Sequence, residues 1–245
     1  MRLGPGAIGP GQSLACDRVI ARAAPAPPFA GLAWYHDGRS VAAQGIGASV
    51  SSWLDLTGNG RDVSEASAPA RPVVAAGNGL YFGGANKLST AADAALLGPG
   101  PWSMAAILAY DASALSRTMM SVSNAAVTQG ASFGVGASKH QLIDEAVGTF
   151  QSASNFTAAT KTLVVFELDG DASSSSANFN LYVDGVLTIT APRTYFNALA
   201  SRIWYGQRGN GSSVGKGTLY CGMGISRLFT TPERASLLAL KSLFG

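Results

Sequence analysis

The segment 53–60, WLDLTGNG, constrains the fold most strongly because it joins an apolar strand to a glycine-rich turn. Val50, Trp53, Leu54 and Leu56 give the apolar pattern of a strand that enters a core. Thr57–Gly60 then supplies residues that tolerate positive φ and can close a hairpin. The segment therefore predicts a β-hairpin anchored by a buried tryptophan.

The rest of the chain from Gly31 onward repeats this theme. Short apolar runs are interrupted by Gly, Asn, Ser and Asp about every 8 to 15 residues, which is typical of successive strands. Asp184-Gly185 between two apolar runs is a strong signal for a two-residue hairpin. We predict strands at Leu32–His36, Val50–Leu56, Val73–Ala75, Gly79–Phe82, Trp102–Tyr110, Thr118–Val122, Ala131–Gly136, Gln141–Val147, Lys161–Leu168, Phe179–Val183, Val186–Thr190, Arg202–Gly206 and Tyr220–Phe229. Strands without intervening helical periods indicate an all-β, antiparallel two-sheet sandwich.

One helix is predicted, at Thr231–Phe244. Pro232 suits a first helical turn, and Thr230 with Glu233 can form a capping box. The apolar stripe that should close an edge or end of the sandwich comprises Leu237, Leu240, Leu243 and Phe244.

Three motifs in this order carry a resemblance to a known family. The turn at residues 53–60, the run Asn78–Gly84 and the hairpin Leu181–Val186, followed by a last strand and a short helix, resemble laminin-G-like, concanavalin A-like jelly-roll modules. The resemblance covers about residues 31–245. Such modules occur in tailed-phage structural proteins, so it implies a non-enzymatic virion component: a capsid decoration, head fibre, tail or baseplate protein that displays a lectin-like sandwich for adsorption to host glycan.

Composition agrees with a single sandwich domain. The 245 residues are 47% apolar and only 13% charged, with 30 glycines, which suits closely packed sheets. A net charge of +3 with scattered basic residues gives no reason to expect a nucleic-acid partner. No apolar run reaches the roughly 20 residues of a membrane span, and residues 1–6 do not resemble a signal peptide. We therefore expect synthesis in the host cytoplasm and a place in the virion.

Residues 1–30 differ from the rest because they are rich in Gly and Pro, which disfavour helix and central strand. We predict an extended N-terminal attachment arm that orders against other virion proteins, followed by the sandwich domain at residues 31–245. A leader without fixed structure is the alternative. The small residues and low charge also suggest a homo-oligomer, with a trimer as the guess. The apolar side chains of the arm are Leu3, Ile8, Leu14, Val19 and Ile20.

The two cysteines lie at opposite ends of the sequence. Two residues are too few for a secreted disulfide framework, and they lack the spacing of a zinc site. The simplest interpretation is two reduced thiols, with Cys221 as a small core residue in a strand. A bridge between Cys16 and Cys221 that ties the arm to the domain is the alternative.

Catalytic motifs are incomplete, so we expect no enzyme. Glu167 and Asp169 alternate onto one strand face, as in a laminarinase-like Glu-x-Asp-x-x-Glu motif, but Ala172 replaces the second Glu. His36 and His140 are isolated in sequence, and no nucleophile elbow is present. A laminarinase-like glycoside hydrolase remains the enzymatic alternative.

The glycine turn offers a candidate cation site. Asp55, Asn59 and Asp62 could present oxygen ligands to calcium at the rim of the sandwich, although no cofactor is required. The alternative, which is the commoner role of such residues, is that Asp55 and Asn59 bond to backbone amides within the turn.

The strand end at residues 202–211 offers a candidate glycan site. Aromatic faces stack on sugars while amide and guanidinium groups bond to hydroxyls. We predict that Trp204 faces the core and that the glycan-binding side chains are Tyr205, Gln207, Arg208 and Asn210. A cellular carbohydrate-binding or adhesion module is therefore the non-viral alternative.

Overall fold

The structure, a computed structural model, describes residues 25–93, 96–97, 100–111, 117–123, 130–136, 139–144, 148–170, 177–192, 202–208 and 213–244. Several sequence-based predictions fall on residues outside these ranges. They concern Leu3, Ile8, Leu14, Val19, Ile20, Cys16 and Asn210. The arm and the proposed Cys16–Cys221 bridge therefore stay predictions.

The described residues form sixteen strands and one α-helix. The strands are β1 (Trp34–Asp37), β2 (Ser52–Trp53), β3 (Val63–Ser64), β4 (Val73–Ala75), β5 (Gly79–Gly83), β6 (Leu88–Ser89), β7 (Trp102–Tyr110), β8 (Arg117–Ser123), β9 (Gly130–Gly136), β10 (Lys139–Asp144), β11 (Gly148–Asn155), β12 (Thr162–Asp169), β13 (Asn178–Val183), β14 (Val186–Pro192), β15 (Arg202–Tyr205) and β16 (Lys216–Ile225). The helix is α1 (Thr231–Leu240), and short 3-10 turns lie at Gly38–Ser40, Ala42–Gln44, Ala68–Ala70 and Lys241–Leu243.

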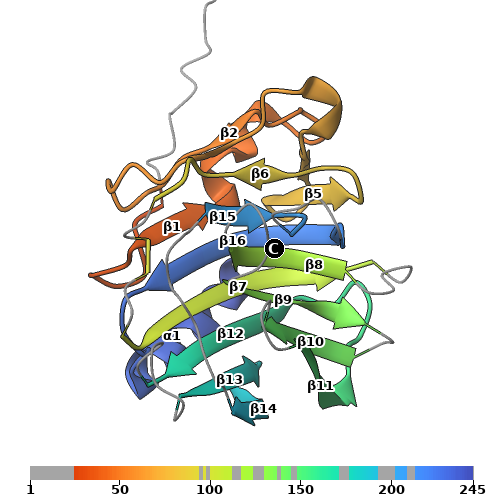
Figure 1. The fold of residues 1–245 in the computed structure, drawn as a ribbon. Helices are drawn as coiled ribbons and strands as arrows, with labels where there is room; N and C mark the ends of the chain where they lie inside the picture. Colours follow the sequence, from red (N-terminus) through yellow and green to blue (C-terminus); the bar gives the residue numbers. More distant parts are fainter. Residues whose placement is uncertain are drawn as a thin grey trace, which may run out of the picture.

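The strands make two eight-stranded sheets that stack face to face (Figure 1). Sheet A has the order β14-β13-β12-β7-β16-β5-β4, and β1 pairs with the half of β16 that β5 leaves open. Sheet B has the order β11-β10-β9-β8-β15-β6-β3-β2. The strand ladders are antiparallel, so the predicted two-sheet sandwich is confirmed.

Two apolar layers hold the fold together. The main layer lies between the sheets and includes Trp34, Trp53, Trp102 and Tyr205, all fully buried. The second layer lies on the outer face of sheet A, where α1 covers it (Figure 1). At roughly 25 cal/mol per Å² of buried apolar area, each of these large side chains stabilises the fold by several kcal/mol before entropy is counted.

The N-terminal side of the second layer includes part of the predicted arm. The Phe29 ring packs edge-on against Phe229, with 5.7 Å between the ring centroids. Phe29 thus lies against the sandwich although the sequence analysis assigned it to residues 1–30.

Several element boundaries were predicted well, and three strands were missed. The range of β7 agrees with the prediction, whereas the predicted strand Val50–Leu56 is reduced to β2. The missed strands β3 and β6 have two residues each, which is too short for a period-2 pattern. The missed β11 is a polar edge strand, GTFQSASN, and so lacks apolar alternation.

The local turn and cap predictions are confirmed. Asp184 and Gly185 both have positive φ, 48° and 82°, and connect β13 to β14. Thr230 Oγ1 accepts a hydrogen bond from the Glu233 N–H, and the Glu233 side chain accepts one from the Thr230 N–H, which completes the capping box.

Two predicted core residues are in fact exposed. Leu54 is 56% exposed because it follows Trp53 on the opposite side of the chain, and Trp53 occupies the core position. Leu243 is 55% exposed because α1 ends at Leu240, so the following turn rotates it away from Leu237 and Phe244.

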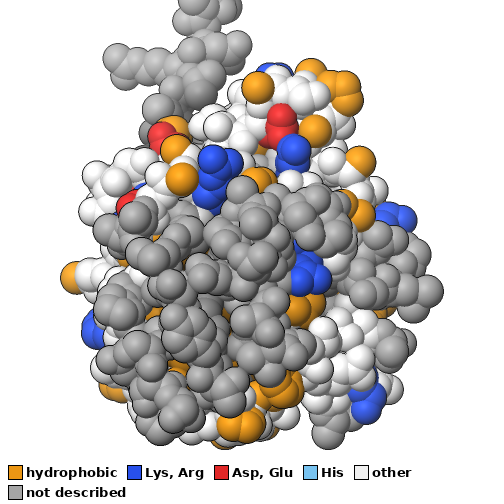
Figure 2. All heavy atoms as spheres, in the orientation of Figure 1, with side chains coloured by type: hydrophobic (Ala, Val, Ile, Leu, Met, Phe, Trp, Pro, Cys, Tyr) orange, Lys and Arg blue, Asp and Glu red, His pale blue; other side chains and the backbone are white. Residues whose placement is uncertain are grey.

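The structure also shows the state of one cysteine and the distribution of the basic side chains. Cys221 is buried in β16, as predicted, and burial raises the pKa of its thiol. Within the described ranges, no helix has the length and apolar character needed to span a bilayer. On the face in Figure 2, the described Lys and Arg side chains are scattered instead of gathered in one patch.

Candidate ligand-binding cleft at the rim of the sandwich

The glycine turn that joins β2 to β3 is organised around one carboxylate. Asp55 Oδ1 accepts hydrogen bonds from the N–H groups of Tyr35 and Thr57, each at 3.0 Å, and Oδ2 accepts one from the Arg61 N–H at 3.1 Å. Gly58 and Gly60 have φ of 82° and 73°, as the sequence predicted. One buried side chain therefore fixes both the turn and β1.

The charge on Asp55 follows from these bonds. Burial by itself raises the pKa of a carboxyl group, but the N–H donors of Tyr35, Thr57 and Arg61, with the Thr57 hydroxyl, outweigh it and lower the pKa of Asp55. Asp55 is thus ionised at neutral pH. Its neighbour Asp62 accepts the Asp55 N–H at 2.7 Å.

His36 supports the same turn from inside the sandwich. Its Nε2 lies 3.0 Å from the Arg61 carbonyl oxygen and its Nδ1 lies 3.0 Å from the Tyr205 hydroxyl. A carbonyl oxygen can only accept, so Nε2–H donates to it and Nδ1 accepts from Tyr205. Burial lowers the pKa of His36 to about 4, against the opposing effect of Asp55, so the ring is neutral near pH 7.

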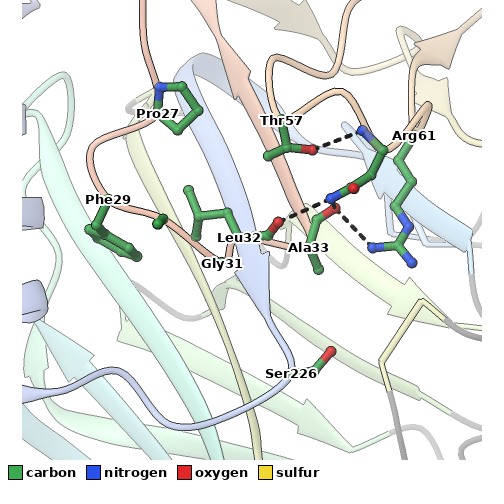
Figure 3. Close-up of a pocket in the computed structure, with 10 residues that line it drawn as sticks. Pro27, Phe29, Gly31, Leu32, Ala33, Thr57, Arg61 and Ser226 are labelled. Carbon is green, nitrogen blue, oxygen red and sulfur yellow. Dashed lines mark hydrogen bonds between the residues drawn. The ribbon is translucent and has the colours of Figure 1, made fainter.

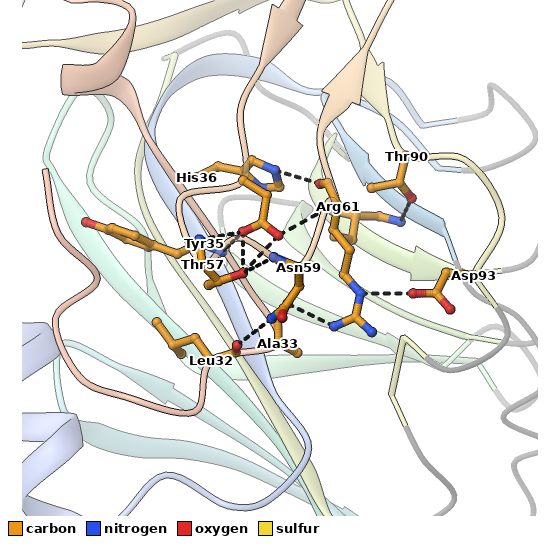
Figure 4. Close-up of polar contacts among 11 residues, drawn as sticks. Leu32, Ala33, Tyr35, His36, Thr57, Asn59, Arg61, Thr90 and Asp93 are labelled. Atoms are coloured by element: carbon orange, nitrogen blue, oxygen red, sulfur yellow. Dashed lines mark hydrogen bonds and ion pairs between the residues drawn. The ribbon is translucent and has the colours of Figure 1, made fainter. Parts of the chain in front are cut away.

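Asn59 and Arg61 connect the turn by hydrogen bonds to the segment that precedes β1. Asn59 Nδ2 donates to the carbonyl oxygens of Leu32 and Ala33 at 3.1 and 2.9 Å. Arg61 Nη1 donates to the Ala33 carbonyl at 2.8 Å, and Nε is paired with Asp93 Oδ2 at 2.9 Å. These contacts hold the two side chains in a fixed wall, which we call the Asn59–Arg61 wall (Figure 4).

An open cavity of about 830 Å³ lies beside this wall. Figure 3 shows Phe29 and Pro27 on one side and Thr57 and Arg61 on the other. The lining side chains that matter for binding are Pro27, Phe29, Leu32, Thr57, Asn59, Arg61 and Ser226. An aromatic ring thus faces amide, guanidinium and hydroxyl groups across a cavity whose volume is typical of small-molecule sites.

Two polar atoms that line the cavity can form further hydrogen bonds. Among the described residues, Asn59 Oδ1 accepts no hydrogen bond and Ser226 Oγ has no partner. Both residues are exposed. They can therefore accept from, and in the case of Ser226 also donate to, a ligand hydroxyl.

The predicted glycan site at β15 needs correction at Tyr205. Tyr205 is fully buried, and its ring packs against His36 and Trp53 with centroids 5.5 Å apart in each case. It faces the layer between the sheets because Ile203 and Tyr205 are the inward residues of β15. Trp204 lies on the opposite face of β15 and is buried too, at 7% exposure, so its predicted burial is confirmed although it is not part of the layer between the sheets. Gln207 is buried as well. Tyr205 thus has no free face for a sugar.

The other two predicted glycan residues give little support to that site. Arg208 is half-buried, and burial lowers the pKa of its guanidinium. Asn210 lies outside the described residues. The structure therefore moves the candidate site from the end of β15 to the glycine turn.

The predicted calcium ligands come together in the turn, but as structural groups. Asp55 accepts from backbone N–H groups of the turn, which is the alternative role weighed from the sequence. Asn59 instead donates to the carbonyl oxygens of Leu32 and Ala33, which lie outside the turn. Asp62 Oδ1 is bonded to the Asp55 N–H. Within the described part of the chain, no group of three or more His, Cys, Asp or Glu side chains is placed to hold a metal ion.

The carboxylates considered for catalysis lie elsewhere. Glu167 is only 2% exposed, and Oε1 is paired with Arg234 Nη1 of α1 at 2.9 Å. Burial raises the pKa of Glu167, which Arg234 opposes. Asp169, two residues later, is exposed. Glu167 therefore fastens the helix to sheet A.

Sequence reasoning missed Phe29, Arg61 and Ser226. Phe29 was assigned to the arm, and Ser226 follows a long strand with no motif of its own. Arg61 had one available signal, because it follows the glycine turn directly. Their convergence depends on three segments that are distant in sequence.

Comparisons with known proteins identify the architecture. No family model and no curated protein matches the sequence. Among solved structures, Trypanosoma rangeli sialidase matches with a TM-score of 0.64 at 17% identity, over 89% of this chain and 34% of that chain. A GH54 α-L-arabinofuranosidase soaked with a cyclic sulfate inhibitor matches with a TM-score of 0.58 at 13% identity, over 87% of this chain and 60% of that chain.

These identities show a shared fold and nothing finer. The chain spans about a third of the length of the sialidase that it matches. It is therefore a two-sheet antiparallel β-sandwich structurally similar to β-sandwich domains of a sialidase and an arabinofuranosidase.

Proposed function

We propose that this chain is a non-catalytic carbohydrate-binding module whose site is the cavity beside the Asn59–Arg61 wall. The observation that carries the proposal is the opposition of one aromatic ring, Phe29, to fixed polar groups across an open cavity of about 830 Å³. Sugars combine apolar ring faces with hydroxyl groups, so they need both kinds of surface.

The rigidity of the wall supports binding. Arg61 is fixed at four points: its N–H by Asp55, its carbonyl oxygen by His36, Nε by Asp93 and Nη1 by Ala33. A preorganised site avoids much of the entropy that binding otherwise costs.

The fold gives independent support. Sialidase and α-L-arabinofuranosidase are names of enzymes that act on carbohydrate, and this chain matches part of each. The virion setting expected from the sequence resemblance gains nothing from these matches. We therefore place the carbohydrate-binding module ahead of the virion component. The hydrolase comes last, because Glu167 is buried under α1 and paired with Arg234.

A glycan array followed by calorimetry on the full chain tests the proposal. Ser226→Ala removes a hydroxyl that makes no hydrogen bond among the described residues, so it should weaken binding about 3- to 10-fold without loss of stability. The matched control is Ser64→Ala, at an exposed position on β3.

Phe29→Ala supplies the second variant. It removes the aromatic wall and should abolish detectable binding while the fold survives, as far-UV circular dichroism can check. Unchanged affinity in both variants, or no binding to any glycan, would contradict the proposal.

A further inference from the structure

A second cavity lies on the other side of the Asn59–Arg61 wall. It measures about 250 Å³, and Asn59 and Arg61 line both cavities. Its remaining polar lining comes from Asp62, Thr90 and Asp93. The smaller cavity falls below the range of roughly 300–1,000 Å³ of a drug-sized ligand, whereas the larger one falls within it. A ligand that touches both faces of the wall must therefore be extended.

The two cavities differ in charge. Arg61 is the only ionisable residue among those that line the larger cavity, whereas Asp62 and Asp93 both line the smaller one. Arg61 is itself paired with Asp93, with side chains 17% and 34% exposed, so its positive charge is largely offset. Asp55 adds a further negative charge behind the turn. The lining of the smaller cavity is thus acidic.

Acidic groups select among sugars by a simple rule. An ionised carboxylate can only accept hydrogen bonds, and every sugar hydroxyl can donate one. A uronic or sialic acid unit carries a carboxylate that Asp62 and Asp93 would repel. Thr90 does not compensate for these two charges, because its hydroxyl is neutral and the residue is only 6% exposed.

We infer that the ligand is a neutral oligosaccharide that spans both cavities, and that Asp62 excludes acidic sugars from the smaller one. This inference rests on the proposed carbohydrate-binding function. Asp62 is a specificity-determining residue: Oδ1 holds the Asp55 N–H at 2.7 Å, and the charge of the carboxylate faces the cavity that it lines.

Calorimetry of the full chain with two ligand series tests the inference. The neutral series contains gluco-, xylo- and arabino-oligosaccharides from one to six units, and the acidic series contains oligogalacturonides and sialyllactose. We expect affinity for a neutral series to rise at least about tenfold from one unit to four, and acidic ligands to bind at least about tenfold more weakly.

The Asp62→Asn variant isolates the charge. Asparagine keeps an oxygen that can accept the Asp55 N–H, so the turn should persist, and the ratio of acidic to neutral dissociation constants should fall at least about fivefold. Asp169→Asn, which removes the same charge at an exposed position on β12, should leave the ratio unchanged.

The outcomes separate the inference from the function on which it rests. Glycan binding that does not strengthen with chain length, or that favours acidic sugars, overturns the inference and leaves the binding function intact. A ratio that Asp62→Asn does not change overturns the role of Asp62. Failure of the unmodified chain to bind any glycan overturns the proposed function itself.

Discussion

At the scale of single residues, Asp55 connects three parts of the structure around the candidate site. It holds the N–H groups of Tyr35, Thr57 and Arg61, and so joins β1, the glycine turn and one wall of the cavity. Its own exposure is only 9%. A buried carboxylate that accepts several backbone bonds is costly to remove, because its donors lose their acceptor and the contact with the Tyr35 N–H is itself buried.

We predict that Asp55→Ala lowers the free energy of unfolding by about 3 kcal/mol, because it leaves three N–H groups without an acceptor. Urea denaturation near pH 7 measures the loss. Asp55→Asn keeps an acceptor oxygen and should lose clearly less. Equal losses for the two variants, or a loss below about 1 kcal/mol for the alanine variant, would show that these bonds do not hold the turn.

His36 makes stability depend on pH. Its pKa is about 4 in the folded chain, lowered by burial, against an ordinary value of 6.5. Between these two pKa values the unfolded state binds more protons than the folded state. The contribution of His36 to the free energy of unfolding is therefore fully present above about pH 6.5 and is lost as the pH falls to about 4. The shift corresponds to a loss of about 3 kcal/mol.

Urea denaturation between pH 8 and pH 4 should reveal this decline. His36→Gln keeps a donor for the Arg61 carbonyl but cannot titrate, so most of the slope between pH 6.5 and 4 should disappear. Buried His140, whose pKa is also lowered by burial, accounts for the part that remains. A slope that the variant leaves untouched would assign the effect to other groups.

At the scale of elements, β16 organises the sandwich. Its two halves pair with β5 and β1 on one side, and β7 lies along the other. Gly222 and Gly224 lie in β16 next to two aromatic rings of the core. A Cβ at Gly224 would overlap the Trp34 indole, and one at Gly222 would overlap the Tyr205 ring. The glycines therefore make room for two of the largest core side chains.

We predict that Gly224→Ala destabilises the protein by about 3 kcal/mol or more, since the Trp34 ring would have to move in a closely packed interior. Thermal denaturation measures this. Gly100→Ala is the control, because no atom lies within 4 Å of a Cβ built there. Equal melting temperatures for the two variants would show that the contact between Trp34 and β16 is not tight.

At the scale of the whole molecule, the sandwich extends beyond the boundary expected from the sequence. Phe29 packs on Phe229 next to α1 and also lines the larger cavity. The segment before Gly31 thus contributes both to the second apolar layer and to the proposed site. Stability and binding should respond together when it is removed.

We predict that a chain starting at Gly31 is less stable than one starting at Pro25 by about 1 to 2 kcal/mol, because it lacks the Phe29 side chain. It should also lose glycan binding. Denaturation and calorimetry on both truncated chains provide the comparison, and Phe29→Ala in the full chain should reproduce both effects. Equal stability of the two truncated chains would confine the sandwich to residues 31–245.

Local sequence patterns were enough to predict the fold class and the turns. Period-2 apolar runs, Asp184-Gly185 and the Thr230–Glu233 cap act through near neighbours in the chain, so the sandwich, the hairpin and the helix start could be predicted. The position of the candidate site, in contrast, depends on long-range packing. Which face of β15 meets the layer between the sheets depends on sheet pairing, and this placed Tyr205 in that layer and Trp204, which is also buried, on the opposite face.

The cavity arises for the same reason. Phe29, Arg61 and Ser226 are far apart in sequence and carry no shared motif, so only the docking of three segments at one rim brings them together. The turn at residues 55–61 could be predicted to exist, but the sequence did not show that Asp55 also accepts the N–H of Tyr35 in β1, twenty residues away. Long-range packing, and not local preference, sets those partners.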